Sequence, residues 1–397
     1  PPRWATWLLS RWGHPDTREE AGGDLLELHT HWAEALGRRQ AARRYVWNAL
    51  KLLRPLAQPK RASEYSSPFF LSPTMLRNYF KIAWRNLLKD KRHTAINLIG
   101  LTLGLGCCLL ITLYVLDELS YDRYSAEHHR VYRTYLALGK PASPALVAVV
   151  GPGVARDLKN TFPEVEASTR LRVTGSPLIT YGSNTFKEER FTFADANFFQ
   201  LFPLLFRQGD AQTALTQPNS IVISEEMARK YFGDEDPMGK MLQFKSWETV
   251  YKVTGVIEPV PANSHFHFDF FASMTSLTEA NEPHWLRNTS FYTYVMLSGD
   301  SAPQRLEAKL PTAVEKYMGP EIDDFAASKK KGEQPRMGLQ PITDIHLRSN
   351  MIMEIEPNGN IRYVYIFAAT ALFLLLIACL NFINLATASA ARRAKEV

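Results

Sequence analysis

Three ionisable side chains alternate in the segment HFHFD, where His265, His267 and Asp269 stand at every second position. On a β-strand they would share one face, and imidazole and carboxylate groups on one face could bind a divalent metal ion. Phe266 and Phe268 stand between them and need the buried face of the same strand. We therefore predict that the polar set faces solvent and that no metal site forms here.

The segment GDEDPMGKM, from Gly233 to Met241, is the nearest approach to a phosphate-binding loop. Five residues rather than four separate its glycines, three of them are acidic and would repel an anion, and Met241 stands where a hydroxyl group would hold Mg²⁺. We predict a turn. The sequence also lacks a CxxC or HExxH motif and a recognisable Ser/His/Asp set, so we expect a non-catalytic chain without a cofactor of its own.

Two long uncharged runs organise the rest of the chain. The first extends from Thr94 to Leu116 and the second from Tyr363 to Ala391. At about 1.5 Å per residue, a helix of either length crosses a hydrocarbon layer of about 30 Å. A buried helix of a soluble protein is usually shorter, so we predict two transmembrane helices.

Basic residues flank each run on one side only. They precede the first run as Arg77, Lys81, Arg85, Lys89, Lys91 and Arg92, and they follow the second as Arg392, Arg393 and Lys395. Short basic flanks stay in the cytoplasm, so the segment between the runs is predicted to lie outside the plasma membrane. The formal net charge of +6 is concentrated in these flanks and the N-terminal region, which indicates contact with membrane lipids rather than nucleic acid.

The pattern predicts an α+β protein whose extracytoplasmic domain is mixed α/β and two-lobed. The expected parts are a helical cytoplasmic prefix domain (1–56), a linker (57–74), an interfacial amphipathic helix (75–93), transmembrane helices (94–119 and 361–391), the extracytoplasmic domain (120–360) and a cytoplasmic segment (392–397). The amphipathic helix could instead pack on a soluble partner. All three cysteines lie in the uncharged runs, so the external domain has no disulfide.

Local signals place several elements in the external domain. Strands are expected at 130–138, 179–181, 185–193, 220–223, 250–257, 265–271 and 291–297, and helices at 154–161, 224–233 and 301–317. Ser224 is expected to cap the second of these helices and Gly233 to end it.

Small and amide side chains occur inside the uncharged runs. Gly100 and Gly104 form a GxxxG pair, which lets another helix approach closely. Asn381 and Asn384 are uncharged polar groups at membrane depth, where they usually bond to a neighbouring helix. We predict that these four residues pack helices together.

Long segments of the chain resemble the MacB-like and FtsX-like family of ABC-transporter permeases. They are MLRNYFKIAWRNLLKDKRHTAINLIGLTLGL, ISEEMARKYFGDEDPMGK, VTGVIEPVPANSHFHFDF and NFINLATASAARRAKEV, and the resemblance covers Met75 to Val397 in order. It includes a MacB-like periplasmic core domain. The first sixty residues resemble the permease prefix domain.

The resemblance implies a permease subunit that transmits the work of a separate ABC ATPase, which would bind ATP and Mg²⁺, to the external domain. It also implies a second permease copy or homologue and a periplasmic or outer-membrane partner. The ATPase contact would start at Arg392, Arg393, Lys395 and Glu396. Family members have four spanning helices, so this chain is expected to be a fragment or the product of a split gene.

Two other classes fit parts of the same pattern. A two-helix membrane sensor, whose external domain binds a ligand, would have the same topology. A membrane-anchored hydrolase would need a catalytic set that the sequence does not offer.

Overall fold

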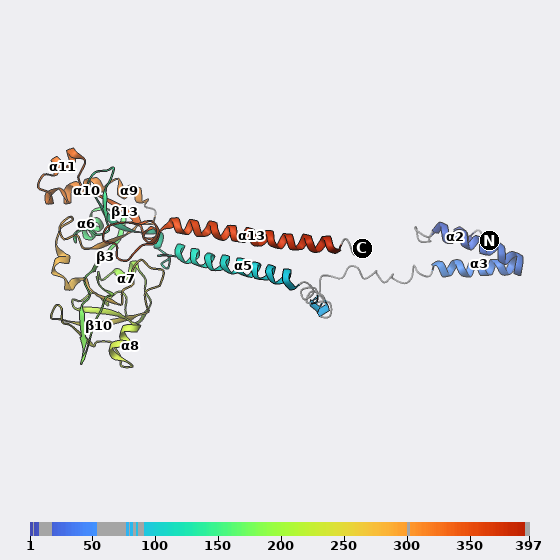
Figure 1. The fold of residues 1–397 in the computed structure, drawn as a ribbon, viewed down its shortest axis with the longest axis horizontal. Coiled ribbons are helices and arrows are strands. Elements are labelled where there is room, and N and C mark those ends of the chain that lie inside the picture. The colour runs from blue at the N-terminus through green and yellow to red at the C-terminus, as the bar shows by residue number, and fades with distance from the viewer. Residues whose placement is uncertain are drawn as a thin grey trace. The chain divides into compact units, whose positions relative to one another are not determined.

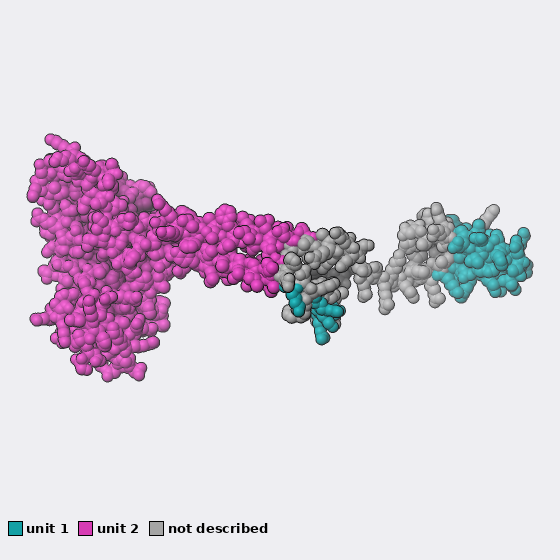
Figure 2. Space-filling model, in the orientation of Figure 1, with its two compact units in different colours: residues 1–94 teal, residues 95–397 magenta. Residues whose placement is uncertain are grey.

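The computed structural model describes residues 1–2, 4–7, 18–53, 77–78, 80–81, 85, 91–299 and 302–393. It divides into two compact units, residues 1–94 and residues 95–397 (Figure 2). The predicted linker at 57–74, Lys395 and Glu396 lie outside the described residues, as does most of the predicted amphipathic helix.

The described part of the N-terminal unit includes the helices α2 (Arg18–Leu36) and α3 (Arg38–Leu53). Gly37 between them has a φ of +80°, a conformation that glycine adopts without steric cost. Leu25 of α2 packs with Tyr45 and Ala49 of α3, and all three are buried. This small core confirms that the N-terminal region is helical.

Two long apolar helices are α5 (Lys91–Leu119), which lies in the second unit from Ala95 onward, and α13 (Ile361–Arg393), which lies wholly in it. They run side by side from the sheet domain (Figure 1). Residues Thr94–Leu119 and Ile361–Asn384 are long and apolar enough to cross a membrane. The most apolar stretch of α5 is 0% buried in the structure, and that of α13 is 11% buried. The core helix of a soluble protein would be mostly buried.

A 13-stranded mixed sheet forms the domain between these helices. Its order is β13-β1-β12-β3-β6-β11-β8-β10-β9-β4-β5, with β2 beside β1 and β7 beside β10. The strands are β1 (Val131–Leu138), β2 (Ala145–Val147), β3 (Val165–Val173), β4 (Leu178–Tyr181), β5 (Asn184–Lys187), β6 (Phe191–Ala194), β7 (Phe206–Gly209), β8 (Ser220–Ser224), β9 (Met241–Phe244), β10 (Thr249–Ile257), β11 (Phe270–Ser273), β12 (Tyr292–Leu297) and β13 (Arg336–Pro341). The pairs β6/β11 and β8/β10 are parallel, so the sheet is mixed as expected.

Short helices cover the sheet. They are α6 (Val154–Thr161), α7 (Phe198–Leu201), α8 (Glu225–Phe232), α9 (Pro303–Glu307), α10 (Leu310–Tyr317), α11 (Phe325–Lys331) and α12 (Ile345–Arg348), with 3₁₀ turns that include η3 (Met274–Ser276) and η4 (Thr278–Asn281). One hydrophobic cluster packs α8 on β8 and β10, and another packs α6 and α10 around Trp285. A third lies around Phe198 and Phe202.

The local signals around α8 give the structure they predict. All five residues of β8 are buried, as expected for an uninterrupted apolar run next to a parallel neighbour. The hydroxyl of Ser224 accepts a hydrogen bond from the backbone N–H of Met227, and Gly233, with φ of 62°, ends the helix.

Three predicted elements differ from the structure. The strand predicted at 265–271 begins only at Phe270. The strand predicted at 185–193 is divided into β5 and β6, which pair with different strands. The helix predicted at 301–317 is interrupted between α9 and α10, where Pro311 has no N–H group to continue the first helix.

Candidate functional site at the base of the sheet domain

The last turn of α5 and the segment before α13 meet at one histidine. Nε2 of His346 lies 3.0 Å from Oε2 of Glu118, and the ring of Tyr121 stacks on the imidazole with centroids 3.5 Å apart. A Cβ at Gly359 would lie 3.0 Å from the same Nε2 and 3.2 Å from the same Oε2. The two helices therefore share one contact where they join the domain.

A buried chain of hydrogen bonds ties the residues after α5 to the middle of the sheet. Asp122 is 1% exposed and has a φ of 58°. Its Oδ1 lies 2.7 Å from Nδ1 of His265, and Nε2 of His265 lies 2.7 Å from the hydroxyl of Tyr294 on β12. Burial raises the pKa of Tyr294 well above its ordinary value, so the phenol keeps its proton.

The hydrogen-bond partners of His265 indicate where the proton of a neutral imidazole ring would lie. The Tyr294 hydroxyl can donate to Nε2 of His265, which leaves the proton of a neutral imidazole on Nδ1 for Asp122. The backbone N–H of His265 also donates to Asp122, at 3.1 Å. The loop that carries His265 is thus fixed to the chain segment that leaves α5.

The segment before α13 is fixed by a buried arginine of β1. The side chain of Arg133 is 0% exposed and binds both carboxylate oxygens of Glu354, at 2.5 and 2.9 Å. It also donates to Gln340 and Ser349. Burial alone would raise the pKa of Glu354, but the bonds from Arg133 outweigh it and the pKa is lowered.

A second ion pair joins the segment before α13 to the loop that carries His265. Nδ1 of His267 lies 2.9 Å from Oε2 of Glu356, and the other ring nitrogen lies 3.2 Å from the carbonyl of Ala262. The hydrogen bond to Glu356 raises the pKa of His267, while the charge of Arg190 opposes the rise. Burial acts to raise the pKa of Glu356, but the contact with His267 prevails and lowers it.

The arrangement can hold two helices to one domain. Among the residues that the structure describes, no three His, Cys, Asp or Glu side chains could hold a metal ion together. His265, His267 and Asp269 take separate partners, which are Asp122, Glu356 and the hydroxyl of Ser224. The predicted exposure of His265 is wrong because the residue precedes β11 in a loop that turns it into the core.

Comparison with protein families identifies the domain. A model described as the MacB-like periplasmic core domain matches residues 94–313, more than half of the chain. The chain belongs to this family. Members of this family are membrane permease components of ABC transporters and are generally non-catalytic themselves. Two membrane-capable helices around a periplasmic-type domain fit an inner-membrane protein.

Solved structures with a similar fold come from three sources. A domain of a putative permease protein from Porphyromonas gingivalis is 22% identical, with 61% of this chain and 98% of that chain covered at a TM-score of 0.48. The periplasmic region of MacB from Actinobacillus actinomycetemcomitans is 14% identical (56% and 94% covered, TM-score 0.38). The extracellular domain of the noncanonic ABC-type transporter YknZ from Gram-positive bacteria is 15% identical (52% and 98%, 0.33). No curated protein matches the chain.

The predicted helix-packing residues of this MacB-like chain lie partly between α5 and α13. A Cβ at Gly104 would lie 3.4 Å from Cβ of Ala378, and one at Gly100 would lie 3.6 Å from Nδ2 of Asn381. Asn384 is exposed. Their part in binding another subunit stays a prediction.

The predicted ATPase contact lies at the edge of the described chain. Arg392 and Arg393 are in the last turn of α13, and Lys395 and Glu396 lie outside the described residues. The segment GDEDPMGKM forms a turn in which Glu235 pairs with Lys240 at 2.7 Å.

Sequence reasoning missed the residues of the junction. These residues are Glu118, Asp122, Arg133, His265, His346 and Glu354, and apart from His265 none of them belongs to a local motif. Their partners lie 143 to 228 positions away in the chain, so no periodic pattern could reveal them.

We expect the pair of His267 and Glu356 to stabilise the domain more at pH 6 than at pH 8.5. The raised pKa of His267 gives a contribution that is complete below 6.5 and is lost as the pH rises through the raised value. The lowered pKa of Glu356 gives a contribution that is present above 4.5 and is lost only as the pH falls through the lowered value. Both groups are partly exposed, so the difference is below about 1 kcal/mol, or roughly 2–4 °C in unfolding temperature.

Thermal unfolding of the purified full chain at both pH values measures this effect. The variant His267→Gln should lose part of the pH dependence. His129→Gln should keep it, because His129 is an exposed histidine in the turn before β1. An unchanged pH dependence in His267→Gln would show that the pair does not stabilise the fold.

Proposed function

We propose that this chain is a permease subunit of an ABC-type exporter or mechanotransmission complex. ATP would be hydrolysed, with Mg²⁺, by a separate ABC ATPase, and the movement of that subunit would reach the sheet domain through α5 and α13. The observation that carries the proposal is the junction, where both helices are bound to the same sheet by buried polar contacts.

The junction suits the transfer of a movement because its contacts are buried and specific. Arg133 with Glu354 holds the α13 side, and Asp122 with His265 holds the α5 side. Breaking a buried ion pair such as that of Arg133 and Glu354 by removing one partner costs about 3–5 kcal/mol. When the helices move, the sheet domain would therefore move with them, and the contacts between helices and domain would stay intact.

The remaining partners follow from the same proposal. Arg392, Arg393, Lys395 and Glu396 would begin the surface that meets the ATPase, and a second permease copy or homologue would complete the membrane part. The basic flanks would bind anionic lipids at the cytoplasmic face of the bacterial inner membrane. A periplasmic or outer-membrane partner would bind the sheet domain. Membership of a permease family favours this reading over a two-helix sensor.

The double variant Gly100→Leu/Gly104→Leu tests whether the helix pair transmits movement. Leucine side chains cannot fit against Ala378 and Asn381, so α5 and α13 should separate. We expect the ATP turnover of the complex that co-purifies with the tagged full-length chain to fall roughly tenfold, which corresponds to about 1.4 kcal/mol of lost packing.

Gly106→Leu is the matched control, because a Cβ at Gly106 meets no atom within 4 Å. It should leave both the co-purified ATPase and its turnover unchanged. Equal turnover in the double variant and in Gly106→Leu would contradict the proposed transmission, and the absence of any co-purifying ATPase would contradict the permease assignment itself.

A further inference from the structure

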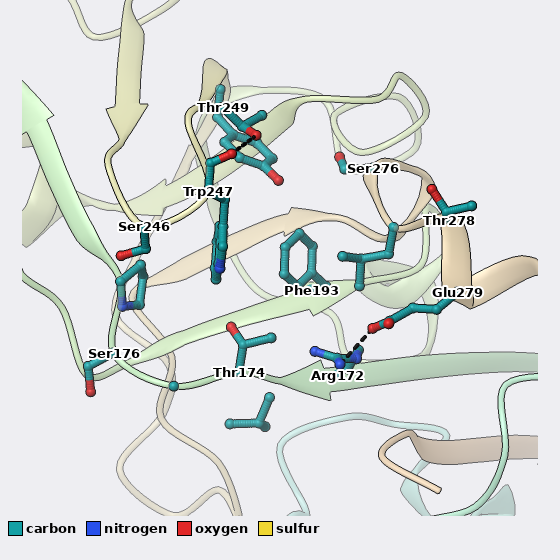
Figure 3. Close-up of a pocket in the computed structure, with 15 residues that line it drawn as sticks. Arg172, Thr174, Ser176, Phe193, Ser246, Trp247, Thr249, Ser276, Thr278 and Glu279 are labelled. Atoms are coloured by element: carbon teal, nitrogen blue, oxygen red, sulfur yellow. Dashed lines mark hydrogen bonds and ion pairs between the residues drawn. The ribbon is translucent and has the colours of Figure 1, made fainter. Parts of the chain in front are cut away.

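An open cleft of about 810 Å³ lies in the sheet domain, apart from the junction. Its walls are the chain between β3 and β4, the turn between β9 and β10, and the η3–η4 segment, with Phe193 and Tyr251 also in its lining (Figure 3). Its volume is within the range of ligand sites. Ligand sites of this volume bind through a few polar groups beside apolar and aromatic side chains.

One wall of the cleft is an unpaired continuation of β3. The pairing of β3 with β12 ends at Leu171, and its pairing with β6 ends at Val173. Residues 174–176 then run on before β4, and within the described chain their backbone groups form no hydrogen bond with other backbone groups. Such a segment can pair with an added strand.

The opposite wall carries an aromatic side chain. Trp247 is 38% exposed, stacks on Phe244 at a centroid distance of 5.6 Å and contacts Phe193 at 5.7 Å. Figure 3 shows its indole ring extending from the β9–β10 turn into the cleft. The hydroxyl of Thr249 donates to the carbonyl of Trp247 at 3.0 Å, which fixes the turn.

The polar groups of the cleft are mostly neutral. Arg172 and Glu279 are paired with each other at 2.6 Å, so their charges cancel locally. Hydroxyl groups line the rest, at Thr174, Ser176, Ser246, Thr249, Ser276 and Thr278. Oγ1 of Thr174 is buried and has no hydrogen-bond partner among the described residues, which is costly unless a partner reaches it in another state.

We propose that this cleft binds an extended, uncharged peptide segment. Its main chain pairs with residues 174–176, and one of its aromatic side chains packs against Trp247. Unpaired backbone groups supply affinity in this mode, and the aromatic wall supplies selectivity. A glycan would use the hydroxyl groups and the indole ring but not the backbone groups. The inference does not depend on ATP-driven movement, since it concerns the sheet domain alone.

Fluorescence anisotropy of the full chain in lipid nanodiscs tests the proposal. The probe is a fluorescein-labelled peptide of sequence Ser-Thr-Val-Tyr-Val-Thr-Ser. We expect saturable binding that weakens at least roughly tenfold when tyrosine is replaced by alanine, and likewise when alternate backbone amides are N-methylated. Chitotriose, a neutral glycan, should not displace the probe.

Variants of the chain locate the binding. Gly175→Leu should abolish it, because Gly175 lines the cleft and a Cβ there meets no atom within 4 Å, so the larger residue can be accommodated without disturbing its neighbours. Trp247→Ala should weaken it roughly tenfold. Gly299→Leu, at an equally open position outside the cleft, should bind as the unaltered chain does.

Three results with the peptide and glycan probes would overturn the proposal. They are the absence of binding by the parent peptide up to about 1 mM, the range of the weakest specific complexes, equal binding by the N-methylated peptide, and displacement of the probe by chitotriose. Full binding by Gly175→Leu at an unchanged unfolding temperature would place the peptide elsewhere on the protein and so would also overturn it.

Discussion

Replacing Arg133 with methionine is expected to lower the unfolding temperature of the sheet domain by roughly 10 °C. The substitution leaves the carboxylate of Glu354, whose side chain is 13% exposed, without its cation. Removing one partner of a buried ion pair costs about 3–5 kcal/mol, and 1 kcal/mol shifts the unfolding temperature of a domain of this size by about 2–4 °C. Thermal unfolding of the purified full chain in detergent measures the shift.

The double variant Arg133→Met/Glu354→Leu separates the lost pair from the uncompensated charge. With both charges removed, more than half of the lost stability should return, because apolar residues can replace a buried pair at little cost. Lys329→Met is the exposed control, since Lys329 and Glu315 are 52% and 57% exposed, and it should shift the unfolding temperature little. A shift in Arg133→Met no larger than this control would contradict the structural role of the pair.

The elements that the sequence predicted well are those with local signals. The apolar runs of α5 and α13 can be recognised without knowledge of any other segment, because a helix in lipid forms its backbone hydrogen bonds within itself. The helix at Val154–Thr161 lies before a proline and ends where expected. The cap at Ser224 and the glycine at 233 mark α8 with residues that lie next to it in the chain.

The remaining features depend on contacts between distant segments. Strand β11 lies between β6 and β8, and no residue of FFAS indicates those neighbours. His265 is held in the core by Asp122, which lies 143 positions away, so the alternation of HFHFD suggested an exposed strand face where the structure has a loop. The close approach of Gly104 to Ala378 also required the structure, because a GxxxG pair does not reveal its partner helix.

We infer that α5 and α13 span the membrane, with the sheet domain outside the cell and the N-terminal helices inside. The three cysteines of the chain all lie in those spanning helices, so replacing them with alanine leaves the sheet domain unaltered. Ser183→Cys then places one thiol on the exposed turn between β4 and β5, and Gln40→Cys places one on the exposed surface of α3.

Labelling of these two variants with a membrane-impermeant maleimide in spheroplasts tests the claim most directly. We predict that Ser183→Cys reacts completely before permeabilisation and that Gln40→Cys reacts only after it. Protection of Ser183→Cys in intact spheroplasts, with reaction only after the membrane is opened, would contradict the account.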